Sequence, residues 1–374
     1  MNQLVIKTDV FKDVCSKILT AVDSTELSIV TETLELFAKD RVLVMSVTNR
    51  EYFAEVRLDM EEDYEFHSTV NASMFLKLVS QITTEEIQLT VSDNALVVKG
   101  NGTYKLPLIF DGEELLTLPK IQIENETSKF PIKAEILNSI LTYNSKELSK
   151  GVISKPIQKL YYMDEMGAIT FTSGACVNSF TLPNPVKVLF NNRLVKLFKL
   201  FKDGEVEFTL GFDAITEDIV QTKVRFASEY VTITAILSCD DSLLQSVPVG
   251  GIRGRANAEY PHSVNVNKDA MIQTINRLTL FNSGKSNLSR PYGKFDFDTH
   301  SVTIYDYSKE NSEVVNYASG EVSSPYSAML NLNDLKTTLE TCTESHLCIS
   351  FGDGSAVVIS RGNIKNVIPE VKLV

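Results

Sequence analysis

Hydrophobic and polar residues recur along this chain with two periods, one typical of helices and one typical of strands. The helical period is clearest in Asn191–Lys202. At about 100° per residue, four of its apolar residues fall within one sector of a helix: Leu194, Leu197, Phe198 and Phe201. Lys196 and Lys199 fall on the opposite side. This stretch therefore predicts a helix with one buried apolar face and one exposed basic face.

Runs of β-branched and aromatic residues follow each predicted helix, as in Val42–Ser46 and Tyr52–Leu58, and predict strands. Glu26–Val30 is predicted to be a strand by the same criterion. The predicted helices begin near residues 9, 73, 134, 192, 268 and 333, which is a spacing of about 60 residues. Each helix follows one strand and precedes three. The chain thus repeats one strand–helix–strand–strand–strand unit six times.

One such unit cannot bury both its helix and one face of its sheet, whereas two units packed together can. We therefore predict an α+β fold of three similar domains, each with two helices on antiparallel sheet. The predicted domains are residues 1–126, 127–248 and 249–374, of about 120 residues each. Between the last two, the glycine-rich stretch Pro248–Asn257 is predicted to be a linker.

The distribution of charge favours a particular use of the helices. The chain has 36 Lys and Arg against 48 Asp and Glu, a net charge of −12, yet its basic residues gather on the predicted helices: Lys12, Lys17, Lys77, Lys146, Lys150, Arg193, Lys196, Lys199, Lys202, Arg277 and Lys285. Ordinary exposure to solvent explains a basic face on one helix, but the repeat would place a basic face on several helices. Two copies joined head to tail would close a ring with basic helices inside, which attracts a polyanion to the hole.

Several functions are disfavoured by what the sequence lacks. It shows no apolar run of membrane-spanning length and no signal peptide, and its five scattered cysteines favour reduced thiols and the cytoplasm. Cys342, His346 and Cys348 do not have zinc-ligand spacing, so no metal or cofactor is predicted. Gly250–Arg255 lacks the Gly-Lys-Ser/Thr ending of a phosphate loop. We therefore predict a non-enzyme.

The chain resembles the family of the bacterial-type DNA polymerase sliding clamp, which is the β subunit of the replicative DNA polymerase III. Four stretches carry the resemblance, in order along the whole chain: Phe66–Val79, Ile169–Ala175, Leu243–Pro248 and Val367–Leu373. The resemblance implies a head-to-tail homodimer ring that encircles duplex DNA without reading its sequence. It also implies that the replicative polymerase and the clamp loader bind through short peptide motifs.

The resemblance further implies a partner-peptide pocket between the second and third domains, formed by Thr172, Gly174, Ala175, Val177, Gln245, Ser246, Asn331, Val357, Ile368 and Pro369. Ordinary packing at a domain junction is the alternative reading of these residues. Ala175-Cys176-Val177 replaces the family's usual His-Arg-Leu, and Gln245 replaces a basic residue. This divergence favours a phage or mobile-element member of the family.

The resemblance also implies a dimer interface between a first-domain strand and a third-domain helix. The matching positions are Tyr104 and Leu106 on the strand and Leu280 and Phe281 on the helix. Pro107 cannot donate a hydrogen bond to a neighbouring strand, so this strand is predicted at a sheet edge. The alternative for Leu280 and Phe281 is that they end a buried helix face.

Two other functions remain open at the level of the sequence. A virion or cell-surface assembly protein of repeated antiparallel modules would have no basic helix lining. An enzyme with a site built from scattered residues would need a deep pocket with perturbed carboxylates. The concentration of Lys and Arg on helices favours the clamp over both.

Overall fold

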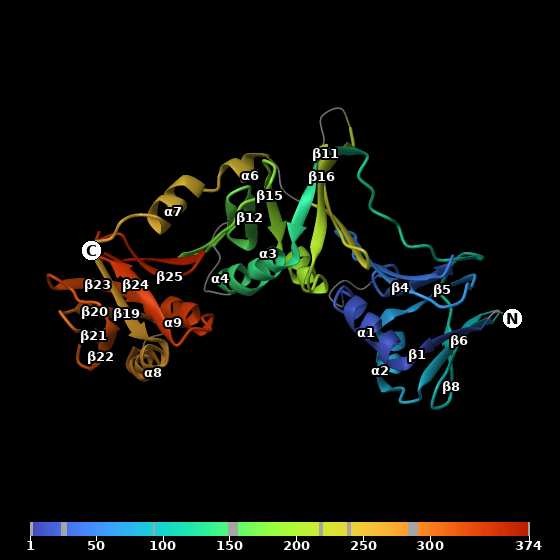
Figure 1. Ribbon diagram of the computed structural model, residues 1–374, viewed down its shortest axis with the longest axis horizontal. Helices are drawn as coiled ribbons and strands as arrows, with labels where there is room; N and C mark the ends of the chain where they lie inside the picture. The colour runs from blue at the N-terminus through green and yellow to red at the C-terminus, as the bar shows by residue number, and fades with distance from the viewer. Residues whose placement is uncertain are drawn as a thin grey trace. The chain divides into compact units, whose positions relative to one another are not determined.

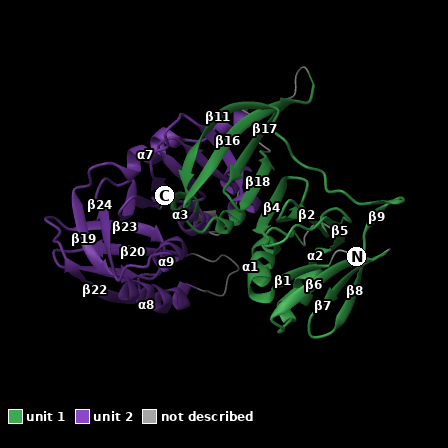
Figure 2. Ribbon diagram, turned by 45° about the vertical axis from the view of Figure 1, so that its right-hand side comes forward, with its two compact units in different colours: residues 1–137, 196–238 green, residues 138–195, 239–374 purple. Residues whose placement is uncertain are grey.

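The computed structural model describes residues 3–23, 28–92, 94–148, 156–216, 220–237, 241–282 and 291–372 (Figure 1). Its order of elements repeats the strand–helix–three-strand unit six times, with short extra elements between some units. The predicted α+β class is therefore confirmed. The chain forms two compact units, residues 1–137 with 196–238 and residues 138–195 with 239–374 (Figure 2). The three domain limits stay a prediction.

The first unit contains two repeats and the sheet strands that follow α5. Its elements are β1 (Leu4–Lys7), α1 (Thr8–Leu19), β2 (Thr33–Lys39), β3 (Val42–Thr48), β4 (Tyr52–Asp59), β5 (Phe66–Asn71), α2 (Ala72–Gln81), β6 (Glu86–Ser92), β7 (Ala95–Lys99), β8 (Thr103–Pro107), β9 (Phe110–Asp111), β10 (Glu114–Leu115), β11 (Asn125–Lys133), η3 (Leu197–Leu200), β16 (Glu205–Ala214), β17 (Val220–Ala227) and β18 (Val231–Ile236). Helix α3 (Ala134–Ser139) and helix α5 (Asn192–Lys196) contain the points where the chain passes between the units.

Two antiparallel sheets dominate this unit, one of four strands in the order β1-β6-β7-β8 and one of eight in the order β11-β16-β17-β18-β4-β3-β2-β5. Helices α1 and α2 pack together, and the rings of Phe11 and Phe75 meet edge to face at 6.0 Å. Strand β8, which ends at Pro107, lies at an edge of the four-stranded sheet. The edge position predicted from that proline is confirmed.

The second unit carries the remaining repeats. Its elements are η1 (Ile140–Asn144), α4 (Ser145–Leu148), η2 (Pro156–Lys159), β12 (Leu160–Asp164), β13 (Gly167–Phe171), β14 (Ala175–Ser179), β15 (Lys187–Asn191), α6 (Asp241–Gln245), α7 (Val249–Ala256), β19 (His262–Asn267), α8 (Lys268–Thr279), η4 (Leu280–Asn282), β20 (Tyr292–Phe297), β21 (Ser301–Tyr305), β22 (Ser312–Ser319), β23 (Tyr326–Asn331), α9 (Leu332–Glu340), β24 (His346–Phe351), β25 (Ala356–Arg361) and β26 (Ile364–Pro369).

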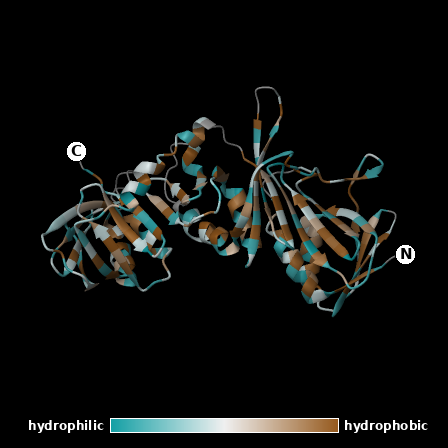
Figure 3. Cartoon of the chain, turned by 45° about the horizontal axis from the view of Figure 1, so that its top comes forward, coloured by the Kyte–Doolittle hydropathy of each residue, from teal (hydrophilic) through white to brown (hydrophobic). Residues whose placement is uncertain are grey.

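One antiparallel sheet of twelve strands runs through this unit, in the order β15-β12-β13-β14-β26-β25-β24-β19-β22-β21-β20-β23. Alternate residues of a strand face opposite sides, so one strand serves two cores. In β25, Val357 packs with the α8 and α9 side, whereas Ala356 and Val358 pack on the side of α7. Strands with one fully buried face, such as β20, instead alternate buried and less buried positions, and hydrophobic and hydrophilic residues alternate along several strands (Figure 3).

The helix predicted over Asn191–Lys202 is shorter in the structure. Helix α5 ends at Lys196, and a 3₁₀ turn, η3, continues it to Leu200. The faces agree with the prediction, because the side chains of the four apolar residues assigned to the buried face are buried while Lys196 and Lys199 are exposed. Among the described helices, none is long and apolar enough to cross a membrane.

Two other predictions about local structure are wrong. Within the described part of Glu26–Val30, the chain turns, since the N–H of Glu32 donates to the carbonyl of Ser28 at 3.1 Å. The predicted linker Pro248–Asn257 contains helix α7. Its glycines disfavour a helix locally, but packing of Ile252 against the neighbouring sheet overrides that preference.

Candidate partner-binding pocket and basic helix surface

A pocket of about 280 Å³ lies in the second unit, where the turn from β13 to β14 meets α7 and the end of β26. Its walls are formed by Phe171, Thr172, Ser173, Gly174, Ala175, Pro248, Gly251, Ile252, Arg255, Val367 and Pro369. Among these lining residues, Arg255 alone carries a charge. The pocket therefore offers an apolar surface with one cationic side chain at its wall.

The turn between β13 and β14 forms one rim of the pocket and is fixed by hydrogen bonds. The N–H of Thr172 donates to the carbonyl of Gly174 at 3.0 Å, and the side-chain amide of Gln158 donates to the carbonyl of Thr172 at 2.9 Å. The hydroxyl of Ser173 donates to Asp334, in the first turn of α9, at 2.5 Å. These bonds hold the rim in place without using the side chain of Ala175.

Helix α7 forms the opposite wall of the pocket and is held to strand β12 by an ion pair. The guanidinium of Arg253 donates to both carboxylate oxygens of Asp164, at 2.7 and 2.5 Å. Both side chains are largely buried, with exposed fractions of 15% and 8%. A bidentate hydrogen bond of this kind fixes the orientation of the two side chains as well as the distance between them. The same helix packs Val249 and Ile252 against the sheet, which aims Ile252 at the pocket.

The ionisation of Asp164 follows from this contact. Burial alone would raise the pKa of its carboxyl, but hydrogen bonds from Arg253 and from the N–H of Met166 outweigh burial. The pKa of Asp164 therefore lies below its ordinary value. The pKa of Arg253 is raised by the same carboxylate, so the pair is ionised at neutral pH.

Basic side chains gather where α1 and the segment after η3 meet in the first unit. The carboxylate of Asp13 contacts the ammonium groups of Lys17 at 2.6 Å and Lys202 at 3.6 Å. The hydrogen bond from Lys17 lowers the pKa of Asp13, although Asp13 itself is half exposed. One acidic residue thus stands between two lysines from distant parts of the chain, which leaves this spot positive.

The other predicted DNA-contacting residues differ in availability. Lys77, Lys146, Lys196 and Lys199 are exposed, and Lys12 and Arg193 are half buried. Arg277 on α8 is exposed, but Glu313 on β22 accepts two hydrogen bonds from it, at 2.7 and 2.6 Å, which offsets its charge. Lys150 and Lys285 lie outside the described residues.

The residues predicted at a dimer interface fall into two groups. Leu280 and Phe281 on η4 expose 71% and 59% of their surface, so the reading of a buried helix end is wrong. Tyr104 on β8 exposes 37%, whereas Leu106 is 3% exposed and packs inward. Strand β8 therefore has an edge position with Tyr104 exposed, whereas Leu106 is part of the buried core.

Comparison with known proteins gives matches of two kinds. The family model "DNA polymerase III beta subunit, N-terminal domain" matches residues 2–119. A curated relative, the "Beta sliding clamp" of Mycoplasmopsis pulmonis, is 28% identical over 152 residues, and that match spans 39% of this chain and 36% of the relative. The sequence match thus covers about a third of the relative's length.

Solved structures extend the likeness in fold to the full length. The DNA polymerase III β chain of Streptococcus pneumoniae aligns over 100% of both chains with a TM-score of 0.78 at 16% identity. The sliding clamp of Bacillus subtilis aligns over the same extent with a TM-score of 0.76 at 16% identity. The chain thus shares the fold of these clamp structures over its whole length, and its residues 2–119 match the N-terminal domain of the DNA polymerase III beta subunit.

Of the pocket residues that this clamp resemblance implied, the structure brings four together: Thr172, Gly174, Ala175 and Pro369. The other six lie elsewhere: Val177, Val357 and Ile368 are buried in the cores, Asn331 caps α9, and Gln245 and Ser246 are exposed at the end of α6.

The sequence reasoning missed seven lining residues: Phe171, Ser173, Pro248, Gly251, Ile252, Arg255 and Val367. For Val367 a signal existed, because it shares a strand face with Pro369, whereas Ile368 faces the other core. The residues of α7 were missed because their stretch was interpreted as a linker.

Proposed function

We propose that this chain is the DNA polymerase III β sliding clamp, a non-catalytic processivity factor of DNA replication. Two copies close head to tail into a ring around duplex DNA and tether the replicative polymerase to it. The observation that carries the proposal is the match to β clamp folds over the whole chain, together with the family match of residues 2–119.

The basic surfaces support non-specific contact with DNA. Exposed lysines such as Lys77, Lys196 and Lys199 attract phosphates, which carry no sequence information. The acidic balance of the whole chain, −12, disfavours coating by nucleic acid over the entire surface. Together these features favour a protein that holds DNA in one place without reading it, and topological closure then replaces tight binding.

Partner recognition rests on the pocket beside α7. Its apolar walls and fixed rim suit a short peptide with apolar or aromatic side chains, presented by the polymerase or by the clamp loader. Gln245, which replaces a basic residue of the family, lies away from this pocket. The pocket keeps its apolar chemistry despite the divergence of His-Arg-Leu to Ala175-Cys176-Val177.

Self-association rests on the exposed side chains of Leu280 and Phe281 and on the free edge of β8. Large exposed apolar side chains on a monomer commonly mark an interface, and an edge strand accepts a further strand. A head-to-tail dimer pairs the two surfaces twice. We expect the homodimer in the cytoplasm, where bacterial replication takes place, and a phage or mobile-element origin stays a prediction.

The deciding experiment compares retention on circular and linear duplex DNA by gel filtration at moderate salt. A ring that encloses DNA stays on circles and slides off linear ends, and it elutes as a dimer. Equal retention on both forms would overturn topological closure, because ordinary electrostatic binding does not distinguish them.

A charge-reversed variant tests the basic surface in the same assay. The double change Lys196→Glu/Lys199→Glu affects exposed side chains, so we expect a folded dimer with weakened retention on circles. The control Lys39→Glu/Lys187→Glu alters two exposed lysines on strands by the same net charge. An equal loss in both variants would contradict a specific role for the helix surface.

A further inference from the structure

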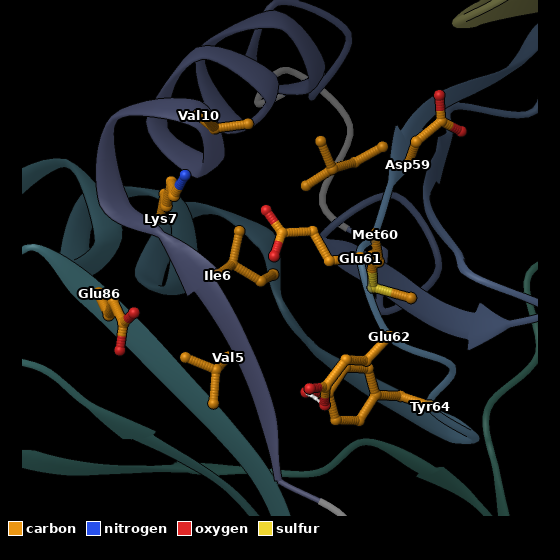
Figure 4. A pocket seen from close by; sticks show the side chains of 11 residues that line it. Val5, Ile6, Lys7, Val10, Asp59, Met60, Glu61, Glu62, Tyr64 and Glu86 are labelled. Atoms are coloured by element: carbon orange, nitrogen blue, oxygen red, sulfur yellow. Dashed lines mark hydrogen bonds between the residues drawn. The ribbon is translucent and has the colours of Figure 1, made fainter.

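A cleft of about 410 Å³ lies in the first unit, between β1 and the chain that leaves the end of β4 (Figure 4). Its walls are formed by Val5, Ile6, Lys7, Val10, Leu58, Asp59, Met60, Glu61, Glu62, Tyr64 and Glu86. It shares no residue with the pocket beside α7. The two sites therefore do not overlap.

One wall of the cleft is an unpaired sheet edge. Strand β1 ends the four-stranded sheet and is paired with β6 on its other side. The N–H of Thr8 donates to the carbonyl of Glu85 at 2.9 Å. Because alternate residues face the partner strand in an antiparallel ladder, Val5 and Lys7 direct their backbone groups to the free side. This edge can accept another strand.

A side chain occupies part of that edge. The hydroxyl of Tyr64 donates a hydrogen bond to Glu62 at 2.8 Å and lies near the N–H of Val5. Tyr64 reaches the edge from the loop after β4, and Figure 4 shows its ring beside the Glu62 carboxylate. A hydroxyl at the end of a rotatable side chain is easily replaced by a backbone carbonyl of an incoming strand.

The cleft combines exposed apolar side chains with acidic ones. Val5 and Val10 expose 37% and 45% of their surface. Four carboxylates line the cleft against one lysine, Lys7: Asp59, Glu61, Glu62 and Glu86. Figure 4 shows the Glu61 carboxylate directed into the middle of the cleft.

These carboxylates have no cationic partner among the described residues. None of the four forms a salt bridge with a described residue. Gathered around one concave surface, they produce a negative potential that favours a cationic occupant and repels nucleic acid. Charge thus selects the occupant, while the strand edge selects its conformation.

We propose that this cleft binds an extended segment of a partner protein, in which lysine or arginine side chains alternate with apolar ones. The segment adds to β1 as a further strand. Its backbone pairs with Val5 and Lys7, its basic side chains contact Glu61 and Glu62, and its apolar side chains cover Val10. Alternation is required because successive side chains of a strand point to opposite faces.

The probe for this proposal is a fluorescein-labelled heptapeptide of alternating lysine and valine, titrated with the full-length protein and followed by fluorescence anisotropy. We expect saturable binding that weakens with added salt. The double change Glu61→Lys/Glu62→Lys should lower the affinity about tenfold, because it reverses two charges at the rim. The control Glu113→Lys/Glu114→Lys changes two exposed carboxylates of the same unit and should leave the affinity within about twofold.

A second probe needs no variant. The same peptide with N-methyl groups on alternate residues keeps its charge but cannot pair with β1 along one edge, so we expect binding to be lost. Absence of saturable binding of the unmethylated peptide at low salt would overturn the proposal. So would an equal loss in the two double variants, which would indicate attraction by net charge alone. Unchanged affinity of the methylated peptide would overturn strand addition.

Discussion

The pocket beside α7 and the cleft beside β1 are both hollows at the side of a sheet, yet they differ in charge and in construction. The pocket has one charged lining residue, Arg255, whereas the cleft has four carboxylates and one lysine. The pocket is closed by a helix that an internal ion pair holds, and the cleft is bounded by an open strand edge.

We expect this difference to give one repeated architecture two kinds of recognition. An apolar hollow with a fixed rim selects side chains by shape, and its affinity changes little with salt. An acidic hollow beside a free edge selects an extended backbone and positive charge, and its affinity depends on salt. Variants that affect one site and leave the other intact therefore test the distinction.

The largest effect is expected from Arg253→Ala. This change leaves the buried carboxylate of Asp164 without its partner, which costs about 3 kcal/mol of unfolding free energy. Helix α7 should detach and the pocket should lose its peptide, while the lysine–valine peptide still binds the cleft. Urea unfolding measures the loss of stability, and fluorescence anisotropy of labelled peptides measures binding at the pocket and at the cleft. The matched control is Arg255→Ala on the same helix, an exposed residue whose loss should change stability by less than about 0.5 kcal/mol.

A smaller effect is expected from Ile252→Ala, which removes apolar surface from the pocket wall. A peptide with apolar and aromatic side chains should bind this variant about tenfold more weakly, because the lost methylene and methyl groups stabilise the complex by about 1–2 kcal/mol. Isothermal titration calorimetry gives the affinity. Ile215→Ala removes an isoleucine that is 57% exposed in the other unit, and an equal loss there would contradict the pocket assignment.

Glycine replacements test whether α7 is a helix or a linker. Gly254 has open space where a Cβ would lie, and its φ is not in the left-handed region. Gly254→Ala should therefore stabilise the second unit by about 0.5–1 kcal/mol, measured by urea unfolding. Gly204 also has open space but a φ of +79°, so Gly204→Ala should destabilise the protein. No gain from Gly254→Ala would favour the linker.

The smallest effect is expected on the pH dependence of folding stability. Because the native pKa of Asp164 lies below its ordinary value, the ion pair stabilises the folded state at neutral pH. That contribution begins to fall as the pH drops below about 4 and is lost as the pH passes through the native pKa. The stability difference between the native chain and Asp164→Asn should therefore shrink with acidification. A constant difference from neutral to acidic pH, in urea titrations at each pH, would contradict this account.

Periodicity in the sequence predicted the repeated order of helices and strands well. The helical spacing of Leu194, Leu197 and Phe198 placed them on a buried face, and Pro107 placed its strand at an edge. These predictions succeeded because a helix or strand face is set by spacing along the chain, which any sequence displays directly.

Where the sequence misled, a contact between distant residues decided the outcome. The glycines around Arg253 indicated a linker, but pairing of Arg253 with Asp164, far away in the chain, and packing of Ile252 support a helix there. Whether Val367 or Ile368 lines the pocket depended on which face of β26 meets α7. No prediction grouped the carboxylates of the acidic cleft into one site, because they come from two strands and the loop after β4.

By itself, then, the sequence determined the class of fold, the sixfold repeat and the polarity of the helix faces. These properties follow from the spacing of residues close together in the chain. The tertiary structure alone decided which turn, helix and strand end enclose a pocket, and which strand edge stays open. Such features depend on residues that are far apart in sequence, and their contacts override local preferences because burial and paired charge outweigh the weak propensities of single residues.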